Sequence, residues 1–194
     1  MENLKVFMSF GALMEQEVRG LLAKFPNDLL IIAYDPLDAC FEKYSLIDHP
    51  HFRAYKYAVS DFTGEGILQV GITGIQSTMV PYSAEKAFRK DGSPEYSGET
   101  QKINVVSAES VLLQYPEIDR LDINVEGSEI PILMNTPLAL LARCKMIHVE
   151  FHIFAKWFEM TQEQVDKCVE RLSSCFNVTI NDSYHPCYSF YRKQ

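Results

Sequence analysis

The sequence lacks the features that would place a protein in a membrane or in an oxidising compartment. No apolar run approaches the roughly 18 to 20 residues that a transmembrane helix needs. The N-terminal stretch MENLKVFMSFGALMEQE is apolar only briefly before it becomes acidic, which is unlike a signal peptide. The five cysteines are odd in number and include no CxxC, which argues against a disulfide framework. We therefore expect a cytoplasmic protein without a membrane span, whose cysteines are small buried apolar residues.

Basic residues are also scarce. The chain has 18 Lys and Arg against 26 Asp and Glu, which gives a net charge of −8 at pH 7. A protein this acidic has no general attraction for phosphate backbones, so we expect no nucleic-acid partner. The sequence also has no internal repeat, low-complexity tract or linker. Its 194 residues, 47% of them hydrophobic, predict a single domain over residues 1–194.

Apolar runs typical of strands alternate with helix-like segments along the chain. Leu29–Tyr34 is continuously apolar, as in a strand that is buried on both faces of a parallel sheet. Thr161–Phe176 is the clearest helix, because Thr161 and Gln164 form a capping-box pattern before an apolar face. The other expected strands are Leu4–Ser9, Phe52–Ser60, Glu65–Ile72, Lys102–Val106, Asp119–Val125 and Lys145–His152. The other expected helices are Ala12–Phe25, Leu37–Leu46, Ala108–Tyr115 and Glu129–Asn135.

This alternation predicts an α/β fold with a mainly parallel, doubly wound sheet. Two late strands, Asn177–Asn181 and Pro186–Tyr191, flank a polar turn and predict an antiparallel edge at the C-terminal end. The polar stretch Gly74–Thr100 is predicted to be a long surface loop, and loops of this length often serve as lids.

Ligands of doubly wound sheets bind beyond the carboxyl ends of the strands, so the residues that follow each strand are the candidates. Asp35 closes the second strand, where it either accepts hydrogen bonds from a ribose diol or serves as a turn residue before Pro36. Gly11 follows the first strand, where it either lets the backbone approach a ligand or forms a plain turn. The absence of a GxGxxG phosphate loop counts against a dinucleotide-binding reductase.

Polar and apolar side chains alternate in the last long strand, Lys145–His152. The period of two puts His148, Glu150 and His152 on one face. Because the two histidines would lie roughly 13 Å apart in a strand, one metal ion cannot take all three residues, whereas the adjacent pair of Glu150 and His152 could hold one. We expect His148 to be a buried, hydrogen-bonded residue instead. The acidic segment Glu126–Glu129 opens a helix, where the helix dipole already favours negative charge.

Four segments occur in order along the chain: AYDPLDACFEKY, YAVSDFTGEGILQV, LDINVEGSEIPIL and IHVEFH. Together they resemble the FkbM-type methyltransferase family, and the stretch DINVEGSE carries the most specific part of the resemblance. The resemblance covers roughly residues 4 to 152, as expected for one such domain. It implies a Rossmann-like class I methyltransferase fold that uses S-adenosylmethionine.

The resemblance also implies roles for particular residues. Asp35 matches the ribose-binding carboxylate of an acidic-Pro dipeptide, whose Pro36 is also expected at the cofactor, and Ser60 and Asp61 match the segment beside the adenine. Asn124 matches the residue near the transferring methyl group. The other matches are Ser9 and Gly11 in the first cofactor motif, Glu126 and Glu129 in the acidic motif, and Glu150 and His152 at the end of the fifth strand.

The first cofactor motif departs from the family pattern D-x-G-A-N-x-G. The segment Ser9-Phe10-Gly11-Ala12-Leu13-Met14-Glu15 keeps only its Gly-Ala pair. Asp122 and Asn124 stand where the family has Lys and Asp. These departures leave a second interpretation open, a degenerate methyltransferase-like domain that binds or interacts without activity.

We predict an S-adenosylmethionine-dependent O-methyltransferase that acts on a hydroxyl group of a sugar or glycan. Methyl transfer needs positioning and a base for the hydroxyl proton, and His152 or Glu150 is the candidate base. Glu126 and Asn124 are expected to orient the acceptor or to hold a divalent cation, for which oxygen ligands suit Mg²⁺ or Mn²⁺. The acids at the strand ends favour an uncharged, hydroxyl-rich acceptor, with Gly74–Thr100 as its lid. The sequence leaves the oligomeric state open.

Overall fold

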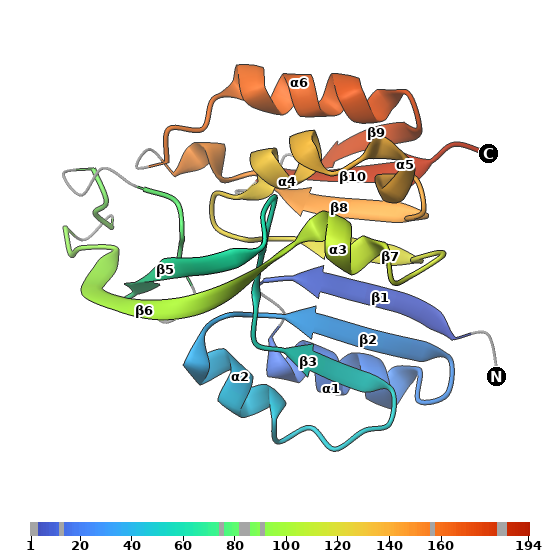
Figure 1. The fold of residues 1–194 in the computed structure, drawn as a ribbon, viewed down its shortest axis with the longest axis horizontal. Coiled ribbons are helices and arrows are strands. Elements are labelled where there is room, and N and C mark those ends of the chain that lie inside the picture. The colour runs from blue at the N-terminus through green and yellow to red at the C-terminus, as the bar shows by residue number, and fades with distance from the viewer. Residues whose placement is uncertain are drawn as a thin grey trace.

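The computed structural model describes residues 4–11, 14–73, 76–81, 86–89, 92–155, 158–181 and 186–194. These residues form a seven-stranded sheet with helices on both faces and a three-stranded sheet at one end (Figure 1). The strands are β1 (Lys5–Phe10), β2 (Leu29–Tyr34), β3 (Phe52–Tyr55), β4 (Ala58–Ser60), β5 (Gly64–Gly71), β6 (Tyr96–Ser107), β7 (Arg120–Ile123), β8 (Met146–Glu150), β9 (Phe176–Asn181) and β10 (Cys187–Arg192). The helices are α1 (Glu15–Lys24), α2 (Asp38–Tyr44), α3 (Ala108–Leu112), α4 (Glu129–Asn135), α5 (Leu138–Leu141), α6 (Gln162–Ser173) and the 3-10 helix η1 (His152–Phe154).

The larger sheet has the strand order β3-β2-β1-β7-β8-β10-β9. β1 pairs in parallel with β2 on one side and with β7 on the other, so the direction of winding reverses between β1 and β7. Such a reversal is a topological switch point, and ligands bind beyond the carboxyl ends of the strands there. β10 pairs antiparallel with both β8 and β9. The predicted α/β fold with an antiparallel C-terminal edge is therefore confirmed.

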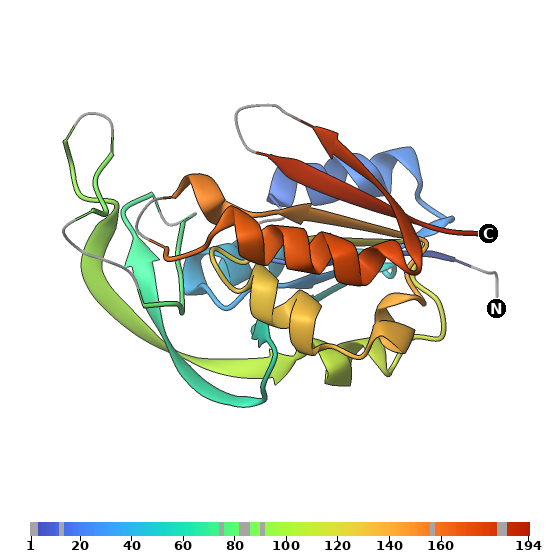
Figure 2. The ribbon, with the colours of Figure 1, turned by 90° about the horizontal axis from the view of Figure 1, so that it is seen from above.

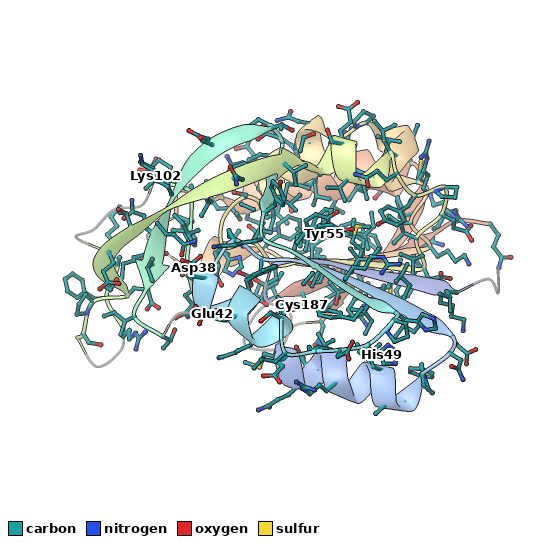
Figure 3. All side chains as sticks on the ribbon, turned by 60° about the horizontal axis from the view of Figure 1, so that its bottom comes forward. Asp38, Glu42, His49, Tyr55, Lys102 and Cys187 are labelled. Carbon is teal, nitrogen blue, oxygen red and sulfur yellow. The ribbon has the colours of Figure 1, made fainter. Side chains whose placement is uncertain are left out.

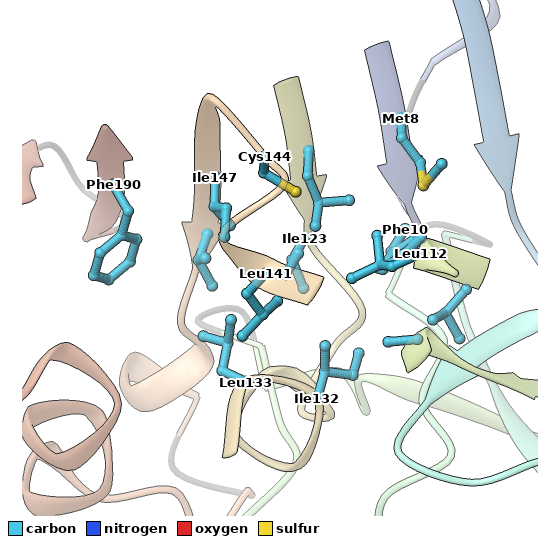
Figure 4. Close-up of a cluster of buried hydrophobic side chains, with 14 of the residues drawn as sticks. Met8, Phe10, Leu112, Ile123, Ile132, Leu133, Leu141, Cys144, Ile147 and Phe190 are labelled. Atoms are coloured by element: carbon cyan, nitrogen blue, oxygen red, sulfur yellow. The ribbon is translucent and has the colours of Figure 1, made fainter. Parts of the chain in front are cut away.

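Each face of the larger sheet packs against its own helices, because successive residues of a strand point to opposite faces. Phe7 of β1 belongs to a core with residues of α1 and α2, whereas Met8 belongs to a core with residues of α3 to α6. Figure 2 shows the blue α1 on one side of the sheet and the yellow to orange α4 and α5 on the other. Figure 4 shows the larger core, in which the β-strand residue Ile123 packs near Leu141 and Ile132 of the helices. Burial on both faces explains the uninterrupted apolar run of β2.

The smaller sheet has the order β4-β6-β5, and its β5 and β6 form a long curved antiparallel ribbon (Figures 1 and 2). Its buried side chains pack against the start of α2 through Leu37. The buried members of this cluster are Leu37, Ala58, Leu68, Ile103 and Val105. The ribbon is therefore fixed to the carboxyl end of β2 and forms a wall beside the switch point.

The prediction of one strand over Phe52–Ser60 is wrong, because this stretch forms β3 and β4 in two different sheets. The carbonyl oxygen of Tyr55 accepts hydrogen bonds from the amide nitrogens of Asp35, at 3.1 Å, and Tyr57, at 3.0 Å. The chain turns there and Ala58–Ser60 pairs with β6 instead. Both pieces keep the composition of strands, so the sequence pattern does not show the change of partner.

The predicted surface loop Gly74–Thr100 is wrong at its C-terminal end, because Tyr96–Thr100 belongs to β6. This half of β6 is mostly exposed and polar, so it lacks the apolar alternation of a half-buried strand. Residues 74–75, 82–85 and 90–91 of the predicted lid lie outside the described residues. So do Ala12 and Leu13 of the predicted first helix and the turn residues 182–185.

The last predicted strand is also too long, since β8 ends at Glu150 and His152 begins the 3-10 helix η1. The three polar residues from His148 to His152 therefore do not share one strand face. The predicted C-terminal helix is confirmed as α6, with the capping box between Thr161 and Gln164. None of the helices in the described ranges is long and apolar enough to span a membrane.

Candidate active site

A pocket of about 530 Å³, part of it open to solvent, lies at the carboxyl ends of β1, β2 and β7. The lining residues come from the strand ends, from α2, from the smaller sheet and from the segment after β5. They are Gly11, Tyr34, Asp35, Pro36, Leu37, Cys40, Ala58, Val59, Leu68, Ser77, Met79, Asn124, Val125 and Glu126. The pocket therefore sits at the switch point, where the sequence predicted a ligand.

Gly11 is required by a close approach between backbones. It has φ +75°, and a Cβ placed there would lie 2.0 Å from the carbonyl oxygen of Asn124. Its amide donates to the carbonyl of Tyr34 over 2.8 Å, and the amide of Asn124 donates to the carbonyl of Phe10 over 3.0 Å, so the end of β1 is tied to the neighbouring strand on each side. The hydroxyl of Ser9 donates to the Gly11 carbonyl at 2.7 Å. Gly11 lines the pocket, whereas Ser9 stands behind it as a buried support.

Asp35 lines the pocket and is only 7% exposed. Its Oδ1 accepts a hydrogen bond of 2.9 Å from the amide of Leu37, which closes the turn that follows β2. Burial raises the pKa of this carboxyl to about 6, although the hydrogen bonds from Leu37 and Cys40 oppose the shift. The two interpretations of Asp35 from the sequence thus describe one residue, a turn carboxylate that also faces the pocket.

Gln101 of β6 holds the turn at Asp35 from the other side, and nothing in the sequence pattern indicated it. Its Nε2 donates to the carbonyl of Pro36 over 2.8 Å and to Oδ1 of Asp38 over 3.1 Å. In Figure 3 Asp38 lies on α2 toward the ribbon whose strand β6 carries Lys102. The curved ribbon therefore buttresses the β2 end of the pocket.

Asn124 and Glu150 form a pair at the ends of two adjacent parallel strands. The Nδ2 of Asn124 donates to Oε2 of Glu150 over 2.9 Å. The Oδ1 of Asn124 is buried and has no hydrogen-bond partner among the described residues. Because buried polar atoms are normally satisfied, this oxygen on a pocket-lining residue is a ready acceptor for a donor group of a ligand.

His152 lies between two carboxylates, directly behind the pocket. Its Nδ1 is 2.8 Å from Oε1 of Glu129, and its Nε2 is 3.2 Å from Oε2 of Glu126. Burial alone would lower the pKa of the imidazole, but the two glutamates outweigh it and raise the pKa to about 10. His152 is therefore an imidazolium near neutral pH, which argues against the predicted role as general base.

Glu129 is a fully buried carboxylate whose partners are all N–H groups of the site. Its oxygens accept from the amides of Val125, at 3.1 Å, and Gly127, at 3.1 and 3.2 Å, in addition to His152. These N–H groups satisfy the hydrogen-bonding capacity of the buried carboxylate from within the fold. The second acid of the motif therefore shapes the turn, while the first, Glu126, lines the pocket.

A protein-family model for the methyltransferase FkbM domain matches residues 25–175. The chain belongs to the FkbM methyltransferase family. Among solved structures, this FkbM domain is similar to one named "delta-N METTL16 MTase domain", with 11% identity and a TM-score of 0.43. That match covers 100% of this chain and 76% of the other. No curated protein sequence matches.

The pocket of this FkbM domain fits the nucleoside part of S-adenosylmethionine, the methyl donor that the family implies. Asp35 offers a carboxylate at the end of β2, where ribose diols bind in such folds. Asn124 offers its unsatisfied Oδ1 to a donor group. Gly11 lines the same pocket and has no side chain to enter it. These three residues would hold the cofactor.

Ser60 and Asp61, which the sequence assigned to the adenine, do not line the pocket of the FkbM domain. The Ser60 hydroxyl donates to Oδ1 of Asp61 at 3.2 Å, and Asn135 of α4 donates to Oδ2 of Asp61 at 2.7 Å. These contacts tie β4 to α4, and the preceding Ala58 and Val59 reach the pocket. An adenine contact of Ser60 or Asp61 stays a prediction.

The sequence left Glu150 and His152 open as a metal-binding pair; in the structure Glu150 accepts a hydrogen bond from Asn124, and His152 contacts Glu129. Within the described ranges no group of three or more His, Cys, Asp or Glu residues could hold a metal ion. The divalent cation expected from the sequence therefore has no support in the FkbM domain. The prediction for His148 is confirmed in its hydrogen bond, which joins Nδ1 to the Ser189 hydroxyl over 2.9 Å, although the residue is only half-buried.

Proposed function

We propose that this FkbM domain transfers the methyl group of S-adenosylmethionine to a hydroxyl group of an uncharged, hydroxyl-rich acceptor such as a sugar or glycan. The charge of the pocket is the observation that carries the proposal. Asp35 and Glu126 are carboxylates, and the described residues that line the pocket include no Lys, Arg or His. With Asp35 facing the ribose, a phosphate or carboxylate on the acceptor would meet the like charge of Glu126, whereas a hydroxyl group can donate a hydrogen bond to it.

The chain's part in the reaction is to orient the two molecules and to accept the hydroxyl proton. When bound, S-adenosylmethionine supplies a methyl group whose C–S electron pair leaves on sulfur as the acceptor oxygen attacks. We assign the proton to Glu126, because it is the carboxylate at the β7 end of the pocket. His152 holds Glu126 from behind, and Glu150 fixes the side chain of Asn124.

Two further assignments belong to the same proposal. We place the reaction in the cytoplasm, because the cysteines are free thiols in the structure and four of them have a pKa raised by burial, as expected of inert structural cysteines. We also expect no nucleic-acid partner, since the net charge of −8 repels phosphate backbones.

Calorimetric titration with S-adenosylhomocysteine tests the cofactor part of the proposal. We expect saturable binding, and no heat of binding at millimolar ligand would instead favour the degenerate, inactive domain. The acceptor part is tested with matched pairs of a neutral glycoside and its phosphorylated counterpart. We expect transfer to the neutral member of a pair, and transfer only to phosphorylated members would contradict the assignment.

In Glu126→Gln we expect lost turnover with S-adenosylhomocysteine affinity within about threefold, since a base acts on the transition state rather than on cofactor binding.

A further inference from the structure

Glu126 has a backbone conformation that its own side chain does not favour. Its φ is +52°, and among the described residues it is the one non-glycine with a positive φ. Residues in such regions persist only where the surrounding structure holds them, and they gather at functional sites. The next residue, Gly127, also has a positive φ of +109°, so the turn after β7 is left-handed over two residues. The contacts that hold this turn therefore decide where the Glu126 carboxylate points.

Thr78 contacts this turn from a distant part of the chain. Its Oγ1 donates to the carbonyl oxygen of Glu126 over 2.6 Å and accepts from the amide of Val80 over 3.0 Å. Thr78 is completely buried. The same segment also leaves little room for a side chain at position 127, since a Cβ on Gly127 would lie 3.3 Å from the side chain of Val80. The hydroxyl of Thr78 is thus a bridge between the segment after β5 and the peptide of Glu126.

The main chain of Thr78 is itself fixed to the ribbon. Its amide donates to the carbonyl of Gln69 over 3.0 Å, and its carbonyl accepts from the Gln69 amide over 2.7 Å. Close packing supports this bridge, because a Cβ on Gly71 would lie 2.6 Å from the carbonyl oxygen of Gln76. Thr78 is therefore a rigid support, and the part of the predicted lid around it is a fixed wall of the pocket.

The opposite end of Glu126 is held by His152. The imidazole Nε2 is 3.2 Å from the Glu126 carboxylate, and Glu129 anchors the other ring nitrogen. Glu126 is thus held by two contacts: Thr78 bonds its backbone carbonyl, and His152 contacts its carboxylate. If the first contact is lost, the peptide is free to rotate away from the left-handed region, and the carboxylate turns with it.

We propose that Thr78 is a positioning residue, whose hydroxyl holds the Glu126 peptide in its left-handed conformation and so presents the Glu126 carboxylate to the pocket beside His152. Its effect on turnover rests on the proposed function of Glu126 as the base. Its effect on the geometry of the turn does not, so the two can be tested separately.

The matched variants are Thr78→Val, which keeps the shape and removes the hydroxyl, and Thr78→Ser, which keeps the hydroxyl. We expect Thr78→Val to lower kcat by about tenfold or more, with the KM for the acceptor and the Kd for S-adenosylhomocysteine within about twofold, as for a group that acts only on the transition state. Thr78→Ser should restore most of the kcat. Thr179→Val on the exposed strand β9 is the control for a threonine replacement far from the site.

A second measurement needs neither cofactor nor turnover. The ¹⁵N shifts of the His152 imidazole report whether the ring is still an imidazolium at pH 8. We expect Thr78→Val to move these ¹⁵N shifts toward those of the neutral ring, because the Glu126 carboxylate is no longer aligned with the imidazole. Thr78→Ser should leave the shifts in place.

If Thr78→Val does not fold, Thr78→Ala removes the same hydroxyl without adding a group that could clash. Hydroxyl-free variants with the parent His152 shifts and the parent kcat would overturn the proposal. If the unmodified protein fails to bind S-adenosylhomocysteine, the proposed function fails, and the His152 shifts still decide the role of Thr78.

Discussion

The side chain of Asn124 is held in one orientation by Glu150. Because a carboxylate only accepts hydrogen bonds, the Asn124 amide must direct Nδ2 toward Glu150, at 2.9 Å, and keep Oδ1 for another partner. The family pattern has an aspartate at this position. An aspartate here would place its carboxylate within hydrogen-bond distance of the Glu150 carboxylate. The asparagine instead supplies the N–H donor that Glu150 can accept from.

Asn124→Asp is therefore expected to make stability strongly dependent on pH. Two adjacent carboxylates cannot both ionise cheaply, so the pair would retain a proton in the folded state. Its folded-state pKa would lie above the unfolded value, and stability would fall as the pH rises through that raised pKa. We expect a loss of about 1–3 kcal/mol at pH 8, as for other buried groups without a suitable partner, and a smaller loss at pH 5. Thermal unfolding at both pH values checks this, and equal losses would contradict the pairing with Glu150.

Asp35→Asn should separate stability from binding. The pKa of Asp35 is raised from 3.8 to about 6, so the folded state binds the proton more tightly, and its carboxyl lowers stability increasingly as the pH rises from 4 through 6. Asparagine keeps an oxygen for the Leu37 amide and removes the buried charge. We expect a gain of up to about 3 kcal/mol at pH 7.5 and little gain at pH 4.

Asp35→Asn should also weaken the binding of S-adenosylhomocysteine by about 1–3 kcal/mol, the cost of a lost charged partner in a buried site. Asp35→Ala should weaken this binding as well. Calorimetry measures the affinity, and denaturant unfolding measures the stability. A dissociation constant that stays unchanged in both variants would remove the ribose contact from Asp35.

Gly11→Ala tests the close approach of β1 to β7. A Cβ would lie 2.0 Å from a backbone oxygen at φ +75°, so the strand ends must separate. We expect a loss of roughly 3 kcal/mol or more, in the range of severe backbone conflicts, or failure to fold. Gly20→Ala in α1 is the matched control, because nothing lies within 4 Å of its Cβ position. There we expect a gain of about 0.5–1 kcal/mol from helix propensity.

His152→Ala should lower turnover far more than it weakens cofactor binding, because it releases the side chain of Glu126. It should also destabilise the fold by about 3–5 kcal/mol, since Glu129 loses its buried countercharge. The folded-state pKa of about 10 lies above the ordinary 6.5, so the stabilisation by His152 is present in full below pH 6.5 and is lost as the pH rises through 10. Comparing unfolding free energies at pH 6.5 and 10.5 checks the sign. A difference between protein and variant that does not shrink with pH would contradict the ion pairs.

The sequence located the three strands whose carboxyl ends line the pocket, β1, β2 and β7, but it did not show the side-chain partners. Apolar runs and capping residues locate the elements, so Asp35, Asn124 and Glu126 could be placed at one edge of the sheet before the structure was known. The support from Gln101 and Thr78 could not be predicted, because both residues are polar and lie in or beside a strand without apolar alternation. His152 was placed on the wrong element, because a period of two continues by chance past the end of β8.

The curved ribbon supports the site at both ends, with Gln101 at the turn after β2 and Thr78 at the turn after β7. The register between β5 and β6 sets the positions of these two supports relative to each other. Gln69 of β5 exchanges two backbone hydrogen bonds with Thr78. On its other side Gln69 pairs with Thr100 of β6, the residue before Gln101. A slip of one residue between β5 and β6 would move one support relative to the other by about 3.3 Å and reverse the faces of the strand. Substitutions in the ribbon should therefore change nucleoside binding and proton transfer together, whereas substitutions in the larger sheet can change either one alone.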